Sequence, residues 1–442
     1  MQAMKQGFDR RQFLERAAAL SALMAGSGQA APAMQAKPME TVRLGFIGVG
    51  GRGSGHVRDV LRIPQVKLNA VCDINPTRVE AIQNWTQKAG QARPEGYSKG
   101  PADYKRLCAN PNLDAIYVST PWELHVPMCV EAMKNGKHAI VEVPAATTLE
   151  ECWELVETSE ATGKYCIMIE NCNYDRVELM ALNMARKRLF GELVHAECGY
   201  LHDLRGIKFS DRGEGLWRLD HSIRRNADLY PTHGLGPVAQ TLNVNRGNLF
   251  DHMVSLASKT EGLREYARAK FGADSPQAKL DVKLGDVVSS LIRTRAGQTI
   301  LVVHDTNLPR PYSRKILLQG AKGVLEKYPK PQIYIEGRDK NDQWVDLFTN
   351  YAAEFEHPLW KGLQERAKGA GHGGMDFVMN YRLMQCLIKG EAPDMDVYDA
   401  AALSAVTELS ERSIAGRGRS VDFPDFTRGK WRNRQPVGIV TA

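Results

Sequence analysis

Four glycines at positions 48–53 constrain the fold of this chain more than any other feature, because of the residues on either side of them. Residues 41–47 are apolar and β-branched, as in a buried parallel strand, and residues 57–63 have the apolar spacing of a helix. In such a strand–turn–helix unit Gly48 allows a tight turn, Gly50 lets the backbone approach a pyrophosphate, and Gly53 lets helix and strand pack closely. The pattern predicts a dinucleotide-binding fingerprint.

An acidic residue follows at the expected distance. About twenty residues after the last glycine, a second predicted strand at 66–72 ends in Asp73. A carboxylate there accepts hydrogen bonds from ribose hydroxyls, and its charge repels a 2′-phosphate, so NAD(H) is expected rather than NADP(H). A glycine turn without a ligand is the alternative, but strand, helix and acid together favour nucleotide binding.

Strands and helices alternate from residue 41 to about 163, which is typical of a doubly wound parallel sheet. Polar segments at 119–122, 142–144 and 170–174 each follow a predicted strand. Since ligands bind beyond the carboxyl ends of such strands, we expect these segments to face one crevice.

The pattern changes after residue 176. Runs at 287–294, 299–306 and 315–319 resemble antiparallel strands, residues 201–226 form a long polar loop, and 258–285 form a helical excursion or a mobile loop. The predicted fold class is α/β. It combines an N-terminal doubly wound Rossmann domain, 41–170, with a C-terminal substrate-binding α+β domain, 171–442, that has a largely antiparallel open sheet.

The first 33 residues are predicted to be a twin-arginine export signal. Arg10 and Arg11 precede a modest apolar stretch at 17–25 and an Ala-x-Ala site at 31–33. The apolar stretch is too short to span a membrane, and no later run is longer. A disordered basic tail is the alternative. The signal predicts a periplasmic or secreted protein, carried across the membrane already folded.

Composition argues against some partners. The formal net charge of +7 is mild for 442 residues, and the basic residues form no stripe interleaved with aromatic residues, so no nucleic acid is expected. The eight cysteines show no Cys-x-x-Cys pair and no metal-ligand spacing with histidine. They predict buried free thiols and no metal site, and a disulfide in an oxidising compartment is the alternative to the free thiols.

Several motifs resemble known families. The glycine fingerprint, the Ser-Thr-Pro and Glu-x-Pro strand ends and the large second domain resemble the Gfo/Idh/MocA oxidoreductases. The chain more closely resembles glycoside hydrolase family 109, the NAD-dependent α-N-acetylgalactosaminidases. That resemblance rests on the strings STPWELH at 119–125, ENCNY at 170–174, HDLR at 202–205 and YPTHGLGP at 230–237.

Two departures separate this chain from ordinary sugar dehydrogenases. Those enzymes usually have lysine where Val143 stands here, and often an acid four residues before the catalytic histidine, where Leu229 stands. The missing lysine argues against a periplasmic NAD(P)-dependent sugar oxidoreductase. The histidine at 233 and the clustered tyrosines argue against a non-catalytic NAD- and sugar-binding protein. Both remain alternatives.

The resemblance implies a set of ligand contacts. It places Gly51 and Arg52 at the phosphates and Asp73 at the adenosine ribose. Around the nicotinamide half it places Trp122, Glu123, Leu124, His125, Glu142, Val143 and Asn171. Its substrate contacts are Tyr200, Arg218, Tyr230, Pro231, Thr232, His233 and Tyr312. Arg218 could instead form a surface salt bridge, and Trp122 could be a packing residue.

The implied reaction is a redox-assisted elimination that retains configuration. NAD⁺ oxidises C3 of the sugar, a base removes the C2 proton, the aglycone leaves, water adds, and the hydride returns. His233 would accept the proton of the C3 hydroxyl. Tyr174 or Tyr230 would remove the C2 proton if nearby positive charge lowers its pKa. Glu142 would protonate the leaving group or position the nicotinamide ribose.

These roles have simpler alternatives. A histidine at a helix start can be a capping or core residue, and the tyrosines can stack on a sugar or donate hydrogen bonds. The expected partner is a glycan or glycoconjugate with a terminal N-acetylhexosamine. A homodimer is possible, and the sequence leaves the choice between N-acetylgalactosamine and N-acetylglucosamine open.

Overall fold

The computed structural model describes residue 34 and residues 37–440, so the predicted export signal lies outside the described residues. Residues 42–168 build a six-stranded parallel sheet with the strand order β3-β2-β1-β4-β5-β6. This order confirms the predicted doubly wound fold. The strands are β1 Val42–Ile47, β2 Val66–Cys72, β3 Glu95–Tyr97, β4 Ala115–Val118, β5 His138–Val141 and β6 Cys166–Met168. The helices between and after them are α2 Gly51–Val60, α3 Pro76–Lys88, α4 Tyr104–Cys108, η1 Trp122–Leu124, α5 His125–Lys134, α6 Leu149–Thr162 and η2 Asn171–Tyr174.

A second sheet of nine strands follows, in the order β14-β13-β12-β11-β7-β10-β9-β8-β15. Only its β7–β10 pair is parallel, so the predicted antiparallel character is confirmed. The strands are β7 Leu193–Leu201, β8 Phe250–Ala257, β9 Val287–Thr294, β10 Thr299–Asp305, β11 Leu317–Gly320, β12 Gly323–Glu326, β13 Gln332–Ile335, β14 Val345–Asp346 and β15 Val421–Asp422.

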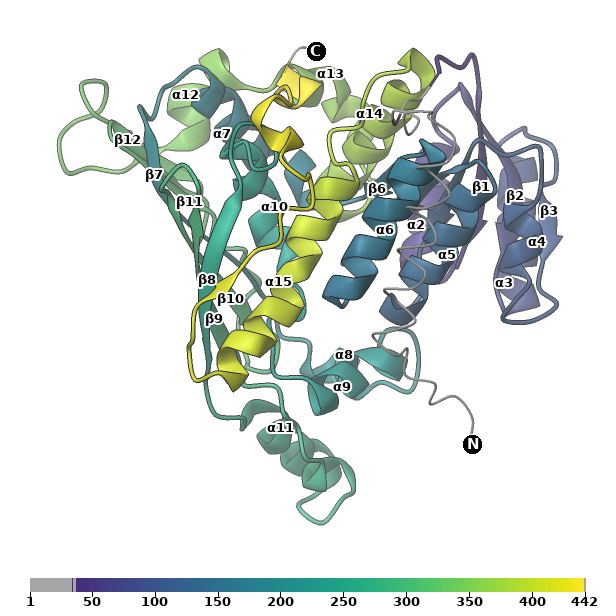
Figure 1. Cartoon of the computed structure of the whole chain (residues 1–442), viewed down its shortest axis with the longest axis horizontal. Helices are drawn as coiled ribbons and strands as arrows, with labels where there is room; N and C mark the ends of the chain where they lie inside the picture. Colours follow the sequence, from purple (N-terminus) through teal and green to yellow (C-terminus); the bar gives the residue numbers. More distant parts are fainter. Residues whose placement is uncertain (1–33, 35–36, 441–442) are drawn as a thin grey trace, which may run out of the picture.

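Helices cover one face of this second sheet. In Figure 1, α15 lies between the sheet and the helices of the Rossmann part, and it contacts both α6 and β8. In β9, Val288, Ser290 and Ile292 are buried while Ser289 and Leu291 are exposed, as expected of an antiparallel sheet with one solvated face. The helices are α7 Arg176–Arg186, α8 Arg205–Lys208, α9 Gly215–Arg224, α10 Thr232–Thr241, α11 Gly262–Phe271, α12 Leu347–Phe355, α13 Pro358–Ala367, α14 Met375–Lys389 and α15 Val397–Ala415, with short 3₁₀ turns η3 Gln277–Lys279, η4 His372–Gly374, η5 Lys430–Arg432 and η6 Gly438–Val440.

The Rossmann sheet is buried on both faces. In β4, Ile116 and Val118 join one apolar cluster, which α15 shares, while Ala115 and Tyr117 join another, which α14 shares. Buried faces on both sides explain why the central strand β4 is a continuous apolar run rather than an alternating one. Two helices from the end of the chain thus complete the core around the first sheet.

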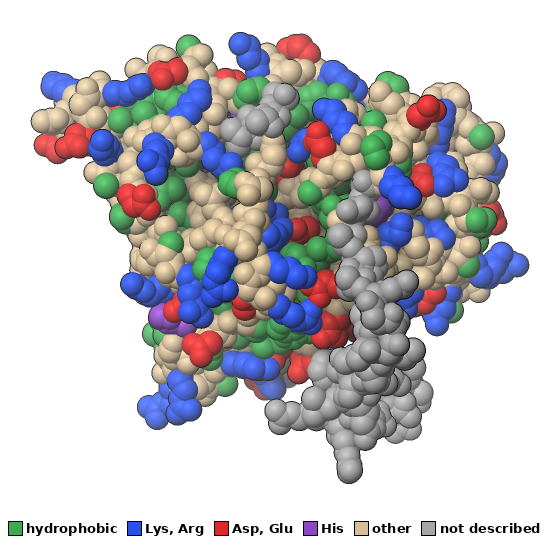
Figure 2. Space-filling view, turned by 45° about the horizontal axis from the view of Figure 1, so that its top comes forward, with side chains coloured by type: hydrophobic (Ala, Val, Ile, Leu, Met, Phe, Trp, Pro, Cys, Tyr) green, Lys and Arg blue, Asp and Glu red, His purple; other side chains and the backbone are tan. Residues whose placement is uncertain are grey.

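The surface and the cysteines agree with a globular protein. On the face drawn in Figure 2, basic and acidic side chains are interspersed. All eight cysteines are free and buried, which confirms the predicted thiols. No helix in the described part of the chain is both long enough and apolar enough to cross a membrane.

The predicted polar loop at 201–226 is wrong, because α8 and α9 occupy most of it. Apolar periodicity does not predict these two helices, because some of the side chains that they bury are polar and are buried by tertiary contacts. The Lys208 ammonium is 3% exposed and donates to Thr306 Oγ1 at 2.8 Å and to Asn307 Oδ1 at 2.6 Å, where β10 ends. The 258–285 segment contains the helix α11, which projects at the bottom of Figure 1.

Lys208 should make stability depend on pH. Burial, helped by the nearby charge of Arg218, lowers the pKa of Lys208 to about 7. The unfolded chain keeps this proton up to about pH 10.4, so between about pH 7 and pH 10 it binds more protons than the folded chain. The free energy of unfolding therefore gains a contribution that rises with pH across this window. Denaturant unfolding of wild type and Lys208→Met should show their difference growing in favour of wild type with rising pH. A difference that stays constant would contradict the assignment.

Candidate active site

The glycine turn after β1 has the geometry that the sequence predicts. Gly48 has a φ of 81°, and a β-carbon on it would lie 2.5 Å from the Ser119 carbonyl oxygen. A β-carbon on Gly53 would lie 2.0 Å from the Gly48 carbonyl oxygen. Gly50 precedes α2 and would meet only the Arg78 guanidinium, at 3.3 Å, while a β-carbon on Gly51 would meet nothing within 4 Å. The N-terminus of α2 is therefore sterically open where a phosphate is expected.

Asp73 supports this turn directly. One of its carboxylate oxygens accepts a hydrogen bond from the Val49 amide at 2.9 Å, and the other accepts from the Asn75 amide at 2.9 Å. The side chain follows β2 and is almost buried, with the Arg78 guanidinium 3.8 Å away. Since a carboxylate offers about four lone-pair sites, it retains capacity to accept from a ribose.

Arg52 connects the end of β5 with α14. Its Nε donates to Glu142 at 2.9 Å, and its Nη1 donates to Asp376 at 2.9 Å. The buried His56 lies one helical turn further along α2, with Nε2 2.7 Å from the same Glu142 oxygen. Asn171 donates to the other Asp376 oxygen at 2.6 Å. The first and last thirds of the chain thus meet at one ion-pair network.

The network defines the charge of Glu142. Burial by itself would raise the pKa of Glu142, but Arg52 and His56 hold it well below its usual range. A carboxylate held ionised is a poor proton donor. Of the two roles predicted for Glu142, positioning the nicotinamide ribose therefore fits the structure better than protonating the leaving group.

Residues 122–125 link the end of β4 to α9. His125 is buried with one ring nitrogen 2.8 Å from the Pro144 carbonyl oxygen and the other 2.9 Å from that of Thr120. Burial lowers the pKa of His125. Glu123 lies 2.9 Å from the His221 ring of α9. Leu124 is 42% exposed. Val143, which follows the next strand of the sheet, β5, is buried.

Arg218 lies in an aromatic cage. Its guanidinium carbon is 4.8 Å from the centre of the Tyr230 ring, 5.1 Å from that of Trp122 and 5.2 Å from that of Trp217. The residue is 8% exposed, and its Nε donates to Glu214. These contacts rule out the exposed salt bridge considered as an alternative. They also place Trp122 in contact with other predicted site residues.

The predicted substrate tyrosines Tyr200, Tyr230 and Tyr312 are gathered near the end of β7. Tyr200, near the end of β7, has its ring centre 4.6 Å from that of Tyr230, and its hydroxyl is 2.9 Å from His202 Nδ1. Tyr312 is 38% exposed at the edge of this group, with its ring 5.0 Å from the His202 ring. Pro231 and Thr232, both buried, begin α10 and bring the next residue, His233, to the same rings.

Neither candidate tyrosine base has a lowered pKa. Burial and the nearby Asp394 raise the pKa of Tyr174 well above its usual value, and its hydroxyl donates to Asp394 at 3.1 Å. Burial also raises the pKa of Tyr230, although Arg218 opposes that rise. The lowered pKa expected of a tyrosine base is thus found for neither residue, and the Tyr174 hydroxyl is engaged away from the site rings. Tyr230 lies beside His233, with ring centres 4.8 Å apart.

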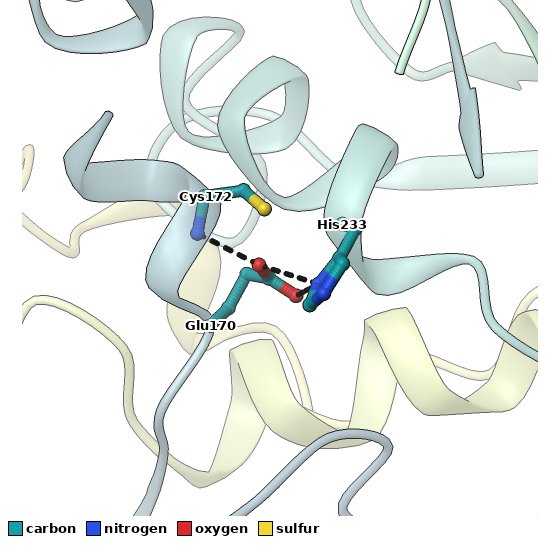
Figure 3. A group of neighbouring side chains, drawn as sticks. All are labelled: Glu170, Cys172 and His233. Carbon is teal, nitrogen blue, oxygen red and sulfur yellow. Dashed lines mark hydrogen bonds and ion pairs between the residues drawn. The ribbon is translucent and has the colours of Figure 1, made fainter. Parts of the chain in front are cut away.

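His233 is paired with Glu170, which follows β6. Figure 3 shows the imidazole of α10 pointing at this carboxylate, with Nδ1 2.9 Å from each of its oxygens. Cys172 lies next to the pair, and the three side chains offer ligand atoms within 4.8 Å of one another. Burial raises the pKa of the Cys172 thiol well above its usual value, and Nδ1 is already hydrogen-bonded. The geometry therefore favours an acid–imidazole pair over a metal centre.

Sequence reasoning missed three contributors to the site. Glu170 lies in a strand-end segment expected to face the crevice, but no role was predicted for its side chain. His56 stands four residues after Arg52 on the same helix, a spacing that places both on one face. Nothing in the sequence predicts that Asp376 belongs to the site, because it lies more than 300 positions away from its partner Arg52.

Two family models match the chain. Residues 42–170 match the oxidoreductase family with an NAD-binding Rossmann fold, and residues 174–433 match the C-terminal domain of glycosyl hydrolase 109. The first match and the fold agree on an NAD-binding Rossmann domain.

Relatives and solved structures extend this picture. A glycosyl hydrolase family 109 protein of Shewanella pealeana is 47% identical over 91% of this chain and 89% of its own length. An α-N-acetylgalactosaminidase of Shewanella oneidensis is 45% identical over 94% of this chain and 92% of its own length. Levoglucosan dehydrogenase in complex with NADH and levoglucosan has the same fold, with a TM-score of 0.68 at 19% identity over 87% of this chain and all of that one. The family model covers more than half of the chain and both relatives cover nearly all of it, so the chain belongs to glycosyl hydrolase family 109.

Proposed function

We propose that this protein removes terminal α-N-acetylgalactosamine from glycans, with NAD acting as a catalytic cofactor. The carrying observation is the position of His233, which is held by Glu170 and flanked by Tyr200 and Tyr230. The activity of the Shewanella oneidensis relative supports the choice of sugar. His233 is a positioned general base for proton transfer. The buried Arg218 guanidinium supplies a polar group for recognising the sugar.

When bound, NAD⁺ supplies a reversible hydride acceptor for C3 of the sugar. The N-terminus of α2, Arg52 and Asp73 would hold its phosphates and ribose, and Glu142 would orient its nicotinamide half. His233 holds the proton of the C3 hydroxyl while C3 is a ketone, and returns it afterwards. Because Tyr174 is engaged with Asp394, removal of the C2 proton falls to Tyr230, where the Arg218 charge opposes the rise in pKa that burial causes.

A sugar dehydrogenase is the competing function, since the solved structures of similar fold include dehydrogenases. The residue at the Glu-x-Pro position argues against it. Val143 is buried and apolar, and its side chain cannot exchange a proton with a reacting hydroxyl.

One experiment separates the two functions. Purified protein, without added NAD⁺, is incubated in D₂O with p-nitrophenyl α-N-acetylgalactosaminide. A retaining elimination releases nitrophenolate, places deuterium at C2 of the sugar and leaves the cofactor oxidised at the end. Slower turnover of substrate deuterated at C2 or C3 would support breakage of those bonds. Net accumulation of NADH without nitrophenolate would instead establish a dehydrogenase. Rapid hydrolysis without exchange or isotope effects would refute the elimination.

We propose that residues 1–33 direct export of the folded protein by the twin-arginine route. The support is the sequence pattern, with Arg10 and Arg11 ahead of an apolar stretch. Replacing both by lysine should leave active, unprocessed protein in the cytoplasm. Unchanged export of this variant would contradict the proposal.

We propose further that the solvated face of the second sheet joins two copies of the chain. Leu256 of β8 and Leu291 of β9 are 64% and 44% exposed there and lie on the same face of two paired strands, so a second copy would bury both. Light scattering should give the mass of a dimer, and the double change of both leucines to lysine should give that of a monomer. A monomeric wild type would overturn this proposal.

A further inference from the structure

The carboxylate of Glu170 is built into the end of β6. Glu170 is fully buried and caps η2, accepting a hydrogen bond from the Cys172 amide at 2.9 Å. Its two oxygens are both 2.9 Å from His233 Nδ1, as the dashed lines in Figure 3 show. A buried carboxylate with an amide donor on one side and an imidazole on the other has one fixed orientation.

The negative charge of Glu170 determines which ring nitrogen of His233 carries the proton. Burial alone would raise the pKa of Glu170, but His233 and the Cys172 amide hold it below its usual value. Glu170 is therefore an acceptor, and His233 Nδ1 must donate. Neutral imidazole has one donor and one acceptor nitrogen, so the lone pair lies on Nε2. Within residues 37–440, Nε2 has no hydrogen-bond partner.

The free nitrogen belongs to the part of the ring that faces the site. Tyr200 and Tyr230 contact the imidazole edge-on, at 5.3 and 4.8 Å between ring centres, and the side chain is 14% exposed. The other titratable groups near it are Cys172 and His202. Among all these groups, Glu170 alone is positioned to carry a full negative charge against Nδ1.

The pair joins two parts of the chain that match different families. Glu170 is the last residue of the segment that matches the NAD-binding Rossmann family, and His233 lies within the segment that matches the hydrolase domain. Helix α10 can approach this closely because a β-carbon on Gly236 would lie 2.9 Å from Glu170 Cγ and 2.8 Å from Asn173 Oδ1. The residue four before His233 is the buried Leu229, which offers no charge.

We propose that Glu170 is the positioning residue of the catalytic base, fixing the tautomer of His233 and stabilising its cation. The inference rests on the proposed function. With bound NAD⁺ supplying the hydride acceptor for C3, His233 Nε2 would take the proton of the C3 hydroxyl as that carbon becomes a ketone. Glu170 keeps its negative charge throughout and takes no proton, which parallels the role of the aspartate in serine-protease triads. Because the two residues come from different parts of the chain, the base is complete only when those parts are docked.

Glu170→Gln tests this role with minimal change of shape. The neutral amide cannot balance an imidazolium and can turn its NH₂ group toward Nδ1, which favours the wrong tautomer. We expect kcat to fall by about 10²–10⁴-fold with KM nearly unchanged, and reduction of bound nicotinamide in the first turnover to slow in parallel. The acid limb of the pH profile should move to lower pH, because losing the neighbouring charge makes protonation of His233 less favourable. Glu170→Asp keeps the charge and should recover part of the rate.

The matched control is Cys172→Ser. It alters the buried neighbour of the pair but keeps the backbone amide that Glu170 accepts from, so rate and pH profile should stay near wild type. If Glu170→Gln retains kcat within threefold of wild type, Glu170 does not support the base. If its rate falls with an unmoved acid limb, and Glu170→Asp falls equally, the role is merely structural.

A readout that needs no turnover keeps this test separate from the proposed function. In ¹⁵N-labelled protein, NMR should find the His233 proton on Nδ1 in wild type and not predominantly there in Glu170→Gln. If wild type shows this tautomer but neither hydrolyses the glycoside nor reduces its cofactor, the proposed function fails while the pair stands. If wild type carries the proton on Nε2, the pair itself is refuted.

Discussion

His233→Ala should reduce turnover of an α-N-acetylgalactosaminide by about 10²–10⁴-fold while NAD stays bound. The imidazole is held by Glu170 and flanked by Tyr200 and Tyr230, where the sugar is expected. The cofactor contacts implied for the glycine turn come from other residues. Removing the base therefore leaves the C3 hydroxyl without a proton acceptor and leaves the nucleotide site intact. Steady-state rates and chromatography of the nucleotide released on heating would measure both effects.

A surface histidine provides the control. His252 of β8 has a side chain that is 38% exposed and pairs with Asp251, so His252→Ala should keep full activity. Turnover of His233→Ala within tenfold of wild type would remove the centre of the mechanism. Loss of NAD from His233→Ala would show instead that the residue supports the cofactor site.

Gly53→Ala should abolish tight NAD binding and lower stability. Its added β-carbon would lie 2.0 Å from the Gly48 carbonyl oxygen and 3.0 Å from the carbonyl carbon. Backbone atoms cannot rotate away as a side chain does, so the turn and α2 must separate, and the open N-terminus of α2 moves from its place. Overpacking of this kind costs about 1–3 kcal/mol. Calorimetric titration with NAD⁺ and denaturant unfolding would measure the two effects.

Gly55→Ala is the matched control, two residues further along the same helix. Nothing lies within 4 Å of a β-carbon at that position, and alanine is favoured over glycine in a helix by about 1 kcal/mol. This variant should bind NAD⁺ normally and be at least as stable as wild type. Equal affinity in Gly53→Ala and Gly55→Ala would contradict the steric account of the fingerprint.

Local sequence determined a large part of this protein. The strand–turn–helix unit around Gly48 and Gly53 follows from short-range sterics, and the predicted strands 66–72 and 138–141 coincide with β2 and β5 because short runs rich in apolar and β-branched residues favour strands. The run 287–294 was predicted at the bounds of β9, and the structure alternates its buried and solvated positions. The matching strings added site residues that lie outside these elements, such as His233 at the start of α10.

Only the tertiary structure decided how the charges are paired. Arg52 meets Asp376, and Glu170 meets His233, across separations of 324 and 63 residues, and no local pattern specifies such partners. Tertiary contacts also decided α8 and α9. Their charged residues Lys208 and Arg218 indicated a loop from the sequence, but in the structure Asn307 accepts from Lys208 and aromatic rings surround Arg218. Apolar periodicity reports which face of an element is buried, because burial follows from solvation. It does not report which polar groups meet there, because that depends on the packing of elements distant in the chain.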